Sequence, residues 1–436
     1  MFAKEATAMF TVCSRSARGC RATALLLAFL GLILAFSPAT YGDKKKRTSA
    51  PAGKPVEKIK LDISKLVWPS PPYIARVKFL AYYAGMKFEQ TEAGAKKKPK
   101  SSWMDRLAGT QQKDMTDIVK TFPFQLIGPY GIGVDSHGLV YVADQKVGAV
   151  FIFNTDTRDV QLIRNGQEAH FGLINGIAID DTDRLFVSDG KLHRVMVFKT
   201  VGEGAKLTHE VENVIEEGLK DPVGLAIDEE NRFLYVVDTQ QDQVVVYDAD
   251  TLKLLRRIGT GGKNHWLTTP GDFAAPSNVA VDKEGNVYVT DTLNNRVEIF
   301  DADGKFISLF GKHGDGPGYF ARPKGIAVDG DGHIWVVDQY QDRVQVFNRE
   351  GQLLTYLGEH GNYPGQFASA VGIAIDKKNR VFVTDQYPAR LQMFRYVTDA
   401  EADTEKKRRE QEAQPKAAAK EDAKAHTQSS PANQPE

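Results

Sequence analysis

The feature that most constrains this chain is a module of about 47 residues that recurs six times between Pro129 and Phe394. Each copy contains two apolar runs that end in aspartate, followed by a third run that alternates apolar and polar residues. The first aspartates are spaced by 45, 48, 54, 47 and 47 residues, and they are Asp135, Asp180, Asp228, Asp282, Asp329 and Asp376. The second aspartates are Asp144, Asp189, Asp238, Asp291, Asp338 and Asp385. This period predicts a radially repeated sheet in which each module is one four-stranded blade.

The fifth copy shows the strand pattern of a blade. Gly325–Asp329 is apolar throughout, which is typical of a strand buried on both faces. Ile334–Asp338 is rich in β-branched and aromatic residues, and Arg343–Phe347 alternates with a period of two. A fourth strand is predicted within Gln352–Gly358, as it is in the copy before it within Lys305–Gly311.

The last copy lacks a fourth strand, because the chain becomes highly charged soon after Phe394. A matching segment lies far upstream, at Lys78–Gly85, and resembles Leu353–Gly358 in its pattern. We expect this N-terminal strand to complete the last blade and to close the ring, which removes an exposed sheet edge. The predicted fold is therefore an all-β, six-bladed β-propeller closed by an N-terminal strand.

The modules resemble the NHL repeat, a family named after an Asn-His-Leu triplet between the second and third strands of a blade. The best local match is Asp291–Val297, with Asn295 where the histidine of the family often lies. Gly318–Ile326 and Gly365–Phe367 resemble the segment between blades. The resemblance implies the propeller fold, which hosts binding proteins and enzymes alike.

The resemblance also implies where an enzyme would hold its ligands. Peptide-amidating lyases of this type carry metal-binding histidines directly after the proline that precedes the first strand. The matching positions, here called the entrance residues, are Tyr130, Asn175, Val223, Ser277, Lys324 and Val371. None is a histidine, and no carboxylate is present for the ligand set of gluconolactonase-like propellers. A metal-dependent lyase or hydrolase with its site at the channel mouth remains an alternative.

The regions outside the propeller suggest export. Residues 1–42 carry basic residues before an apolar run, as in a signal peptide, and residues 22–39 could instead remain as a membrane tether. The expected domains are this segment, a basic flexible linker at 43–66, the propeller at 67–397 with an insertion at 86–120, and a charged, disordered or partly helical tail at 398–436. The predicted location is periplasmic or extracellular, or the inner membrane if the segment is retained.

Composition excludes several kinds of site. The only cysteines are Cys13 and Cys20, upstream of the apolar run, so cleavage would leave no disulfide, cysteine-based zinc site or c-type haem attachment. The chain balances 56 basic against 56 acidic residues, which gives no global argument for nucleic acid. RNA binding through the top face, known for some NHL propellers, is a third alternative that export and charge balance argue against.

Three histidines fall in equivalent loops between blades, namely His265, His313 and His360. Imidazoles on adjacent blades could bind a transition metal if they converged. The alternative is that they are solvent-exposed loop residues repeated by duplication, and we predict no cofactor. The Asp-Arg pairs five residues apart recur in four blades, which predicts a structural ion pair at each turn. These pairs are Asp189/Arg194, Asp291/Arg296, Asp338/Arg343 and Asp385/Arg390.

Aromatic residues mark the predicted binding surface. In a propeller, the loops between blades and the loops between strands two and three open on one face, called the top face here. Tyrosine and tryptophan are common binding anchors, although these rings could instead pack on neighbouring loops. The candidates are Tyr340, Tyr387, Gln339, Gln386, Trp266, Tyr319 and Tyr363, together with Lys324 and Asn175 at the entrance. The sequence favours a non-enzymatic, exported scaffold that binds a protein or peptide partner in the cell envelope.

Overall fold

The computed structural model describes residues 62–83, 88–89, 125–166, 168–202, 207–261 and 269–412. The signal or anchor segment 1–42 lies outside the described residues, as do most of the linker 43–66 and the insertion 86–120. Of the two compact units of the chain, all described residues belong to the second, Leu61–Glu436. Within these residues no helix combines the length and the apolar character needed to cross a membrane.

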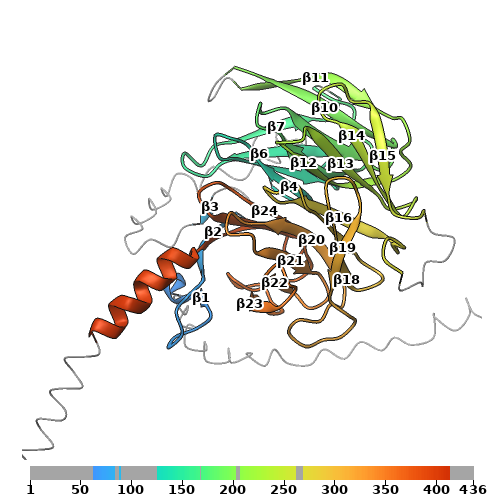
Figure 1. The fold of residues 1–436 in the computed structure, drawn as a ribbon. Helices are drawn as coiled ribbons and strands as arrows, with labels where there is room; N and C mark the ends of the chain where they lie inside the picture. The colour runs from blue at the N-terminus through green and yellow to red at the C-terminus, as the bar shows by residue number, and fades with distance from the viewer. Residues whose placement is uncertain are drawn as a thin grey trace, which may run out of the picture. The chain divides into compact units, whose positions relative to one another are not determined.

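The described strands form six antiparallel sheets, each one blade (Figure 1). Blade one contains β4 (Pro129–Val134), β5 (Leu139–Asp144), β6 (Ala149–Asn154) and β7 (Val160–Arg164). Blade two contains β8 (Ile174–Ile179), β9 (Leu185–Asp189), β10 (Arg194–Val201) and β11 (Thr208–Ile215). Blade three contains β12 (Pro222–Asp228), β13 (Phe233–Asp238), β14 (Gln243–Asp248) and β15 (Leu254–Ile258).

The second half of the ring repeats this order. Blade four contains β16 (Pro276–Val281), β17 (Val287–Asp291), β18 (Arg296–Phe300) and β19 (Phe306–Phe310). Blade five contains β20 (Pro323–Val328), β21 (Ile334–Asp338), β22 (Arg343–Phe347) and β23 (Leu353–Leu357). Blade six contains β24 (Ala370–Ile375), β25 (Arg380–Asp385), β26 (Arg390–Tyr396) and, from the N-terminal side, β2 (Val77–Tyr83). The first strand of each blade contacts that of the next, and β24 contacts β4, so the circle is complete.

The hydrophobic core lies between blades rather than within them. Each of the six buried clusters joins side chains of two neighbouring blades, as when Trp335 of blade five packs in one cluster with Phe394 of blade six. The middle strands are buried on both faces, whereas outer strands such as β19 and β23 alternate between half-buried and exposed residues. A blade therefore depends on both of its neighbours for burial.

The strand β2 closes the ring as the sequence predicted. It pairs antiparallel with β26, and the register shifts between Phe79 and Ala81. This bulge changes which side of the sheet the following residues face. As a result Val77 and Phe79 belong to the core shared with blade five, while Ala81 and Tyr83 belong to the core shared with blade one. One strand thus contributes to two of the six cores.

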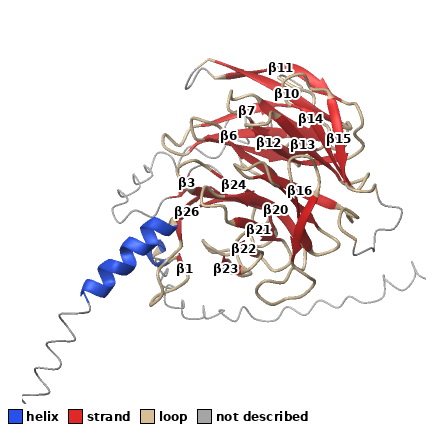
Figure 2. Ribbon diagram, in the orientation of Figure 1, coloured by secondary structure: helices blue, strands red, loops and turns tan. Residues whose placement is uncertain are grey.

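Further elements lie around the closing strand. The short strands β1 (Val67–Trp68) and β3 (Phe88–Glu89) pair with β2, and a 3-10 helix, Ile63–Lys65, precedes β1. An α-helix covers 399–412 and is the blue helix of Figure 2. Its first residue, Asp399, forms an ion pair with Arg76, which precedes β2. The start of the helix therefore contacts the segment that leads into the closing strand.

The predicted Asp-Arg ion pair occurs in two of the four blades. Arg296 lies 2.9 Å from Asp291, and Arg390 lies 2.9 Å from Asp385, with all four side chains nearly inaccessible to solvent. The prediction is wrong for the other two blades. There the guanidinium of Arg194 donates to the carbonyl of His170 at 2.8 Å, and Arg343 stacks over the ring of Tyr356 with 5.3 Å to its centroid.

The pair in blade four includes a further buried acid, Glu298, at a position where blades five and six carry glutamine. Gln345 accepts a hydrogen bond from Gly318 N and donates to the carbonyl of Tyr319, both at 2.7 Å. Glu298 accepts the equivalent bond from Gly271 N at 2.8 Å, but its other oxygen lies 2.6 Å from Arg296. Burial raises the pKa of Glu298 to about 7, although the hydrogen bond from Gly271 opposes the shift.

We expect Glu298→Gln to remove part of the pH dependence of stability. A carboxyl whose folded pKa is about 7 and whose unfolded value is 4.5 contributes stability that is complete below pH 4.5 and is lost as the pH rises through 7. Above pH 7 the variant should gain about 1–3 kcal/mol relative to the parent. Urea midpoints at pH 5 and pH 8 measure this difference. The exposed control Glu350→Gln should leave both midpoints unchanged, and a variant as pH-sensitive as the parent would contradict the expectation.

Candidate functional site

The two sets of repeated aspartates define the two faces of the ring. The second aspartates end the middle strands, are fully buried, and accept hydrogen bonds from the segment that leads into the same blade. In blade five, for example, Asp338 accepts from Ala321 N at 2.7 Å and from Arg322 N at 2.9 Å. The loops between blades and the loops between strands two and three therefore meet on the top face, as predicted. The first aspartates lie at the opposite ends of the inner strands, on the bottom face.

A register shift near the start of every inner strand brings the entrance residues to the channel. In β20, for example, Pro323 pairs with Asp338 and Ile326 with Val336, so that Lys324 and Gly325 lie in the irregular part of the strand. Such bulges redirect side chains and are common next to functional sites. All six entrance residues line one narrow cavity on the axis.

This cavity, here called the neck, is nearly closed by backbone. Its volume is about 10 Å³, and the glycine that follows the entrance residue in five blades allows the close approach. A Cβ atom on Gly131 would lie 2.0 Å from the carbonyl oxygen of Asn175, and one on Gly176 would lie 2.1 Å from that of Val223. Hydroxyls of blades two, four and six fix the neck by donating to carbonyls of the next blade. The bonds are Ser188 to Val223 at 2.6 Å, Thr290 to Lys324 at 2.8 Å and Thr384 to Tyr130 at 2.7 Å.

The predicted glutamines and Asn175 serve the contacts between blades. Gln339 donates to the hydroxyl of Ser369 in blade six at 2.8 Å, and that hydroxyl donates to Gln386 at 3.4 Å. Gln145 donates to the side-chain oxygen of Asn175 at 2.7 Å, while the amide of Asn175 donates to the Pro222 carbonyl at 3.1 Å. Polar side chains thus link blades around the mouth of the channel.

The predicted tyrosines are exposed, and each of three is stacked on a cation. Tyr340 is 67% exposed, Tyr387 59% and Tyr363 70%, whereas Tyr319 is 37% exposed. The guanidinium of Arg322 lies 4.8 Å from the ring centroid of Tyr340 and donates to its hydroxyl at 2.7 Å. The ammonium groups of Lys146 and Lys312 lie 5.5 and 4.8 Å from the ring centroids of Tyr387 and Tyr319, respectively. Trp266 lies outside the described residues.

Lys324 is the charged entrance residue. Its side chain is half-buried, and burial lowers its pKa to about 8, with a further contribution from the charge of Arg322. Among the described residues its ammonium group makes no ion pair. Burial likewise raises the pKa of Tyr130, the entrance residue of blade one, while Arg322 opposes this shift and Asp221 adds to it. The mouth therefore combines a phenol, an unpaired ammonium group and a guanidinium.

The three candidate histidines are not seen as one ligand set. His360 is 81% exposed and its Nδ1 lies 2.7 Å from a carboxylate oxygen of Asp342. His313 is exposed in the equivalent loop of the preceding blade, and His265 lies outside the described residues. A metal at these histidines stays an untested alternative to the prediction that no cofactor is bound.

One group of three possible metal ligands does converge among the described residues. Asp135, His137 and Asp183 lie at turns on the bottom face, between blades one and two. Their oxygens already accept hydrogen bonds, because Leu139 N donates to Asp135 at 2.7 Å and Ser136 N donates to Asp183 at 2.9 Å. These contacts account for the group as a polar link between two blades.

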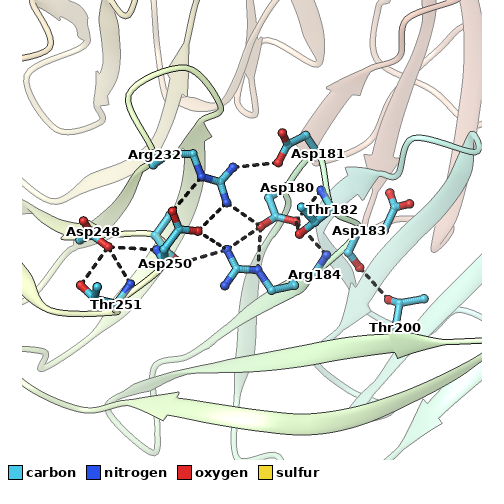
Figure 3. Close-up of polar contacts among 11 residues, drawn as sticks. Asp180, Asp181, Thr182, Asp183, Arg184, Thr200, Arg232, Asp248, Asp250 and Thr251 are labelled. Atoms are coloured by element: carbon cyan, nitrogen blue, oxygen red, sulfur yellow. Dashed lines mark hydrogen bonds and ion pairs between the residues drawn. The ribbon is translucent and has the colours of Figure 1, made fainter.

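The bottom face carries a second polar link, between blades two and three (Figure 3). Arg184 and Arg232 both contact the buried carboxylate of Asp180, at 2.8 and 3.4 Å, and both contact Asp250, at 3.2 and 2.8 Å. Burial opposes ionisation of Asp180, but hydrogen bonds from Thr182 and Arg184 hold its pKa below the usual value. Since each of these charges has a partner, the network links blades two and three on the bottom face.

Two residues of the site, Lys146 and Arg322, were not predicted from the sequence. Lys146 lies two residues after the second aspartate of blade one, and Arg322 lies sixteen residues before that of blade five. Their fixed offset from this aspartate is the signal that could have placed them at the mouth. Their stacking on tyrosines of the same or the adjacent blade depends on side-chain directions that the repeat does not encode.

Comparison with known proteins supports the repeat assignment. A family model of six-bladed β-propellers, DUF5128, matches residues 267–334 and 330–397. The curated "NHL repeat-containing protein 2" of Bos taurus is 28% identical over 100 residues, which are 22% of this chain and 14% of that protein. Its counterpart of Homo sapiens is 28% identical over 99 residues, with the same two shares. The chain thus matches a small part of the length of these relatives.

Some solved structures are similar to this chain at low identity. A catalytically inactive virginiamycin B lyase from Staphylococcus aureus with quinupristin has a TM-score of 0.44 and 14% identity, over 62% of this chain and 95% of that one. A gluconolactonase from Xanthomonas campestris has a TM-score of 0.46 and 19% identity, over 62% and 87%.

The six sheets, the closing strand and the central neck define the chain as a six-bladed β-propeller. Its blades resemble the NHL repeats of the curated relatives over the residues that they match.

Proposed function

We propose that this propeller is a non-enzymatic binding protein whose top face holds a protein or peptide partner. One observation carries the proposal. The residue two positions after the second aspartate is a large, exposed apolar or aromatic side chain in three consecutive blades. These residues are Leu293, Tyr340 and Tyr387, exposed by 57%, 67% and 59%. Exposed apolar groups that gather on one face are typical of interaction sites.

The tyrosines are well prepared to act as anchors. Arg322 contacts both the ring and the hydroxyl of Tyr340, and Lys146 lies over the ring of Tyr387. A ring that is already held loses little conformational freedom when a partner binds, so more of the contact energy appears as affinity. Tyrosine is also among the residues that most often dominate binding energy at interfaces.

The cell-envelope location is part of the proposal and rests on the apolar segment 22–39. A signal peptide or an anchor at this position would place the ring outside the cytoplasm. The partner would then be a protein or peptide of the same compartment, and the ring would act as a scaffold in an envelope assembly.

Replacing both anchors should weaken partner binding without loss of stability. In Tyr340→Ala/Tyr387→Ala we expect affinity to fall roughly 10–100-fold, because each anchor is expected to contribute more than 1 kcal/mol. Quantitative crosslinking in intact envelopes measures capture, and thermal unfolding measures stability.

The matched control is Tyr356→Ala on the outer strand β23. This tyrosine is also exposed, by 41%, and is also stacked on an arginine, Arg343. It lies on an outer strand rather than in a top-face loop, so its loss should leave capture intact. Equal capture by the parent and the double variant would show that the partner does not bind at these tyrosines.

A further inference from the structure

The mouth of the channel carries a local excess of positive charge, although the chain as a whole is neutral. Five positions in each blade surround the mouth. They are the entrance residue, the two residues that follow the second aspartate, and two residues of the loop that enters the blade. The last two lie seventeen and sixteen positions before that aspartate, or eighteen and seventeen in blade three. Over the six blades these positions hold five cations, Lys146, Lys191, Lys220, Arg322 and Lys324, and one acidic residue, Asp221. A local excess of cations attracts anions.

Lys324 is where this charge reaches the axis. Its backbone carbonyl accepts hydrogen bonds from the hydroxyls of Thr290 and Ser277, at 2.8 and 3.3 Å, which fixes the residue to blade four. Its side chain lines the neck together with five uncharged entrance residues. A half-buried ammonium group without a carboxylate partner is costly unless an anion can approach it. Burial, with a further contribution from the charge of Arg322, lowers the pKa of Lys324 to about 8.

Two further groups face the same space. Arg322, on the same strand segment, is close enough to Lys324 to lower its pKa and close enough to Tyr130 to influence that phenol across the mouth. Asp221 also influences Tyr130, so the acid and the arginine approach the phenol from blades three and five. A carboxylate at the mouth could therefore accept hydrogen bonds from an ammonium group and a guanidinium at once.

The neck is too small to hold a group of a partner, so any bound group must lie outside it at the mouth. Its volume is about 10 Å³, less than a carboxylate or a nucleobase needs. Tyr340 and Tyr387 each have one face covered by a cation of this chain, which reduces the aromatic surface available for base stacking. Apolar side chains also surround the mouth, since Ile127, Leu173 and Leu293 are exposed by 51%, 41% and 57%.

We propose that the top face recognises an acidic peptide segment, with one carboxylate held at the mouth by Lys324 and Arg322. The apolar side chains and tyrosines around the mouth would contact the neighbouring residues of the same segment. This inference rests on the proposed function and specifies the chemistry of the partner at that site.

The test uses a fluorescently labelled peptide of alternating Glu and Leu residues, the same peptide with Gln in place of Glu, and a single-stranded oligouridine. Fluorescence polarisation against the full chain should show binding of the acidic peptide at least about 10-fold tighter than that of the amide peptide. Lys324→Met should remove this preference, and added salt should weaken it. Lys283→Met, which removes an exposed lysine at a turn on the bottom face, should leave it unchanged.

Each other outcome would overturn the inference. Equal affinity for the acidic and amide peptides, or an unchanged preference in Lys324→Met, would exclude carboxylate recognition by this lysine. Tighter, Lys324-dependent binding of oligouridine would assign the site to nucleic acid instead. The variant Tyr340→Ala/Tyr387→Ala separates the proposed binding face from the proposed recognition of a carboxylate. If it loses the envelope partner while the parent shows no preference for the acidic peptide, the docking face stands and its carboxylate specificity fails. If both variants keep the partner, both proposals fail.

Discussion

A chain that lacks the closing strand β2 (Val77–Tyr83) is expected to lose its cooperative unfolding transition. Val77, Phe79, Ala81 and Tyr83 are all at most 6% exposed, and they belong to two different interblade cores. Full burial of each large side chain contributes about 1.5–3 kcal/mol, and the deletion also leaves β26 as an unpaired edge. The summed loss approaches the whole stability of an ordinary domain, which is roughly 5–15 kcal/mol.

Thermal and urea unfolding followed by near-ultraviolet circular dichroism would measure this effect. A chain that begins at Asp62 keeps every described contact of β2 and serves as the control, which should unfold cooperatively. Adding a synthetic peptide of residues 62–83 to the deleted chain should restore part of the transition, since the peptide can pair with the open edge of β26. A deleted chain that unfolds at the midpoint of the control would show that the ring does not need this strand.

The neck is expected to be the second most sensitive part of the molecule. In Gly176→Ala the new Cβ would lie 2.1 Å from the carbonyl oxygen of Val223 and 3.1 Å from the hydroxyl of Ser188, which bonds that same carbonyl. The obstacle is backbone, so the two inner strands must separate. We expect a loss of about 3 kcal/mol or more, at or above the usual cost of overpacking.

Gly330→Ala is the matched control, because a Cβ at this turn meets nothing within 4 Å. It should change the urea midpoint by less than about 0.5 kcal/mol, as surface substitutions usually do. Similar midpoints for the two variants would mean that the inner strands can separate without cost. Blade four carries Asn278 where the other blades have glycine, so a side chain is tolerated at that blade. The test is made at Gly176 because there the carbonyl oxygen of Val223 lies close to the new Cβ.

The fold could be predicted because its signals are repeated six times and act locally. Each second aspartate is needed to bond the backbone that enters its own blade, as Asp338 bonds Ala321 and Arg322, so the same residue recurs at the same offset. The closing strand could be found because Lys78–Gly85 carries the pattern of the outer strands, including the residue at which the register shifts.

The site was harder to predict because it depends on what differs between blades. The Asp-Arg spacing is identical in blades five and six, yet Arg390 is buried on Asp385 while Arg343 turns out to Tyr356. Only the neighbouring residues decide between these arrangements. Lys324 was predicted as an entrance residue, but its lack of an ion-pair partner among the described residues is a property of the assembled mouth.

The pairing of β2 with β26 sets the order of events during synthesis. Val77 pairs with Tyr396, which is 396 − 77 = 319 residues later in the chain. Nearly the whole propeller must therefore leave the ribosome before its first long strand can pair with β26. Contacts of such long sequence separation slow folding, and until they form, the apolar residues of β2 remain a potential chaperone site. A nascent chain arrested before β26 would hold five complete blades and an unclosed ring, which makes ribosome-bound intermediates of this protein a direct way to observe closure.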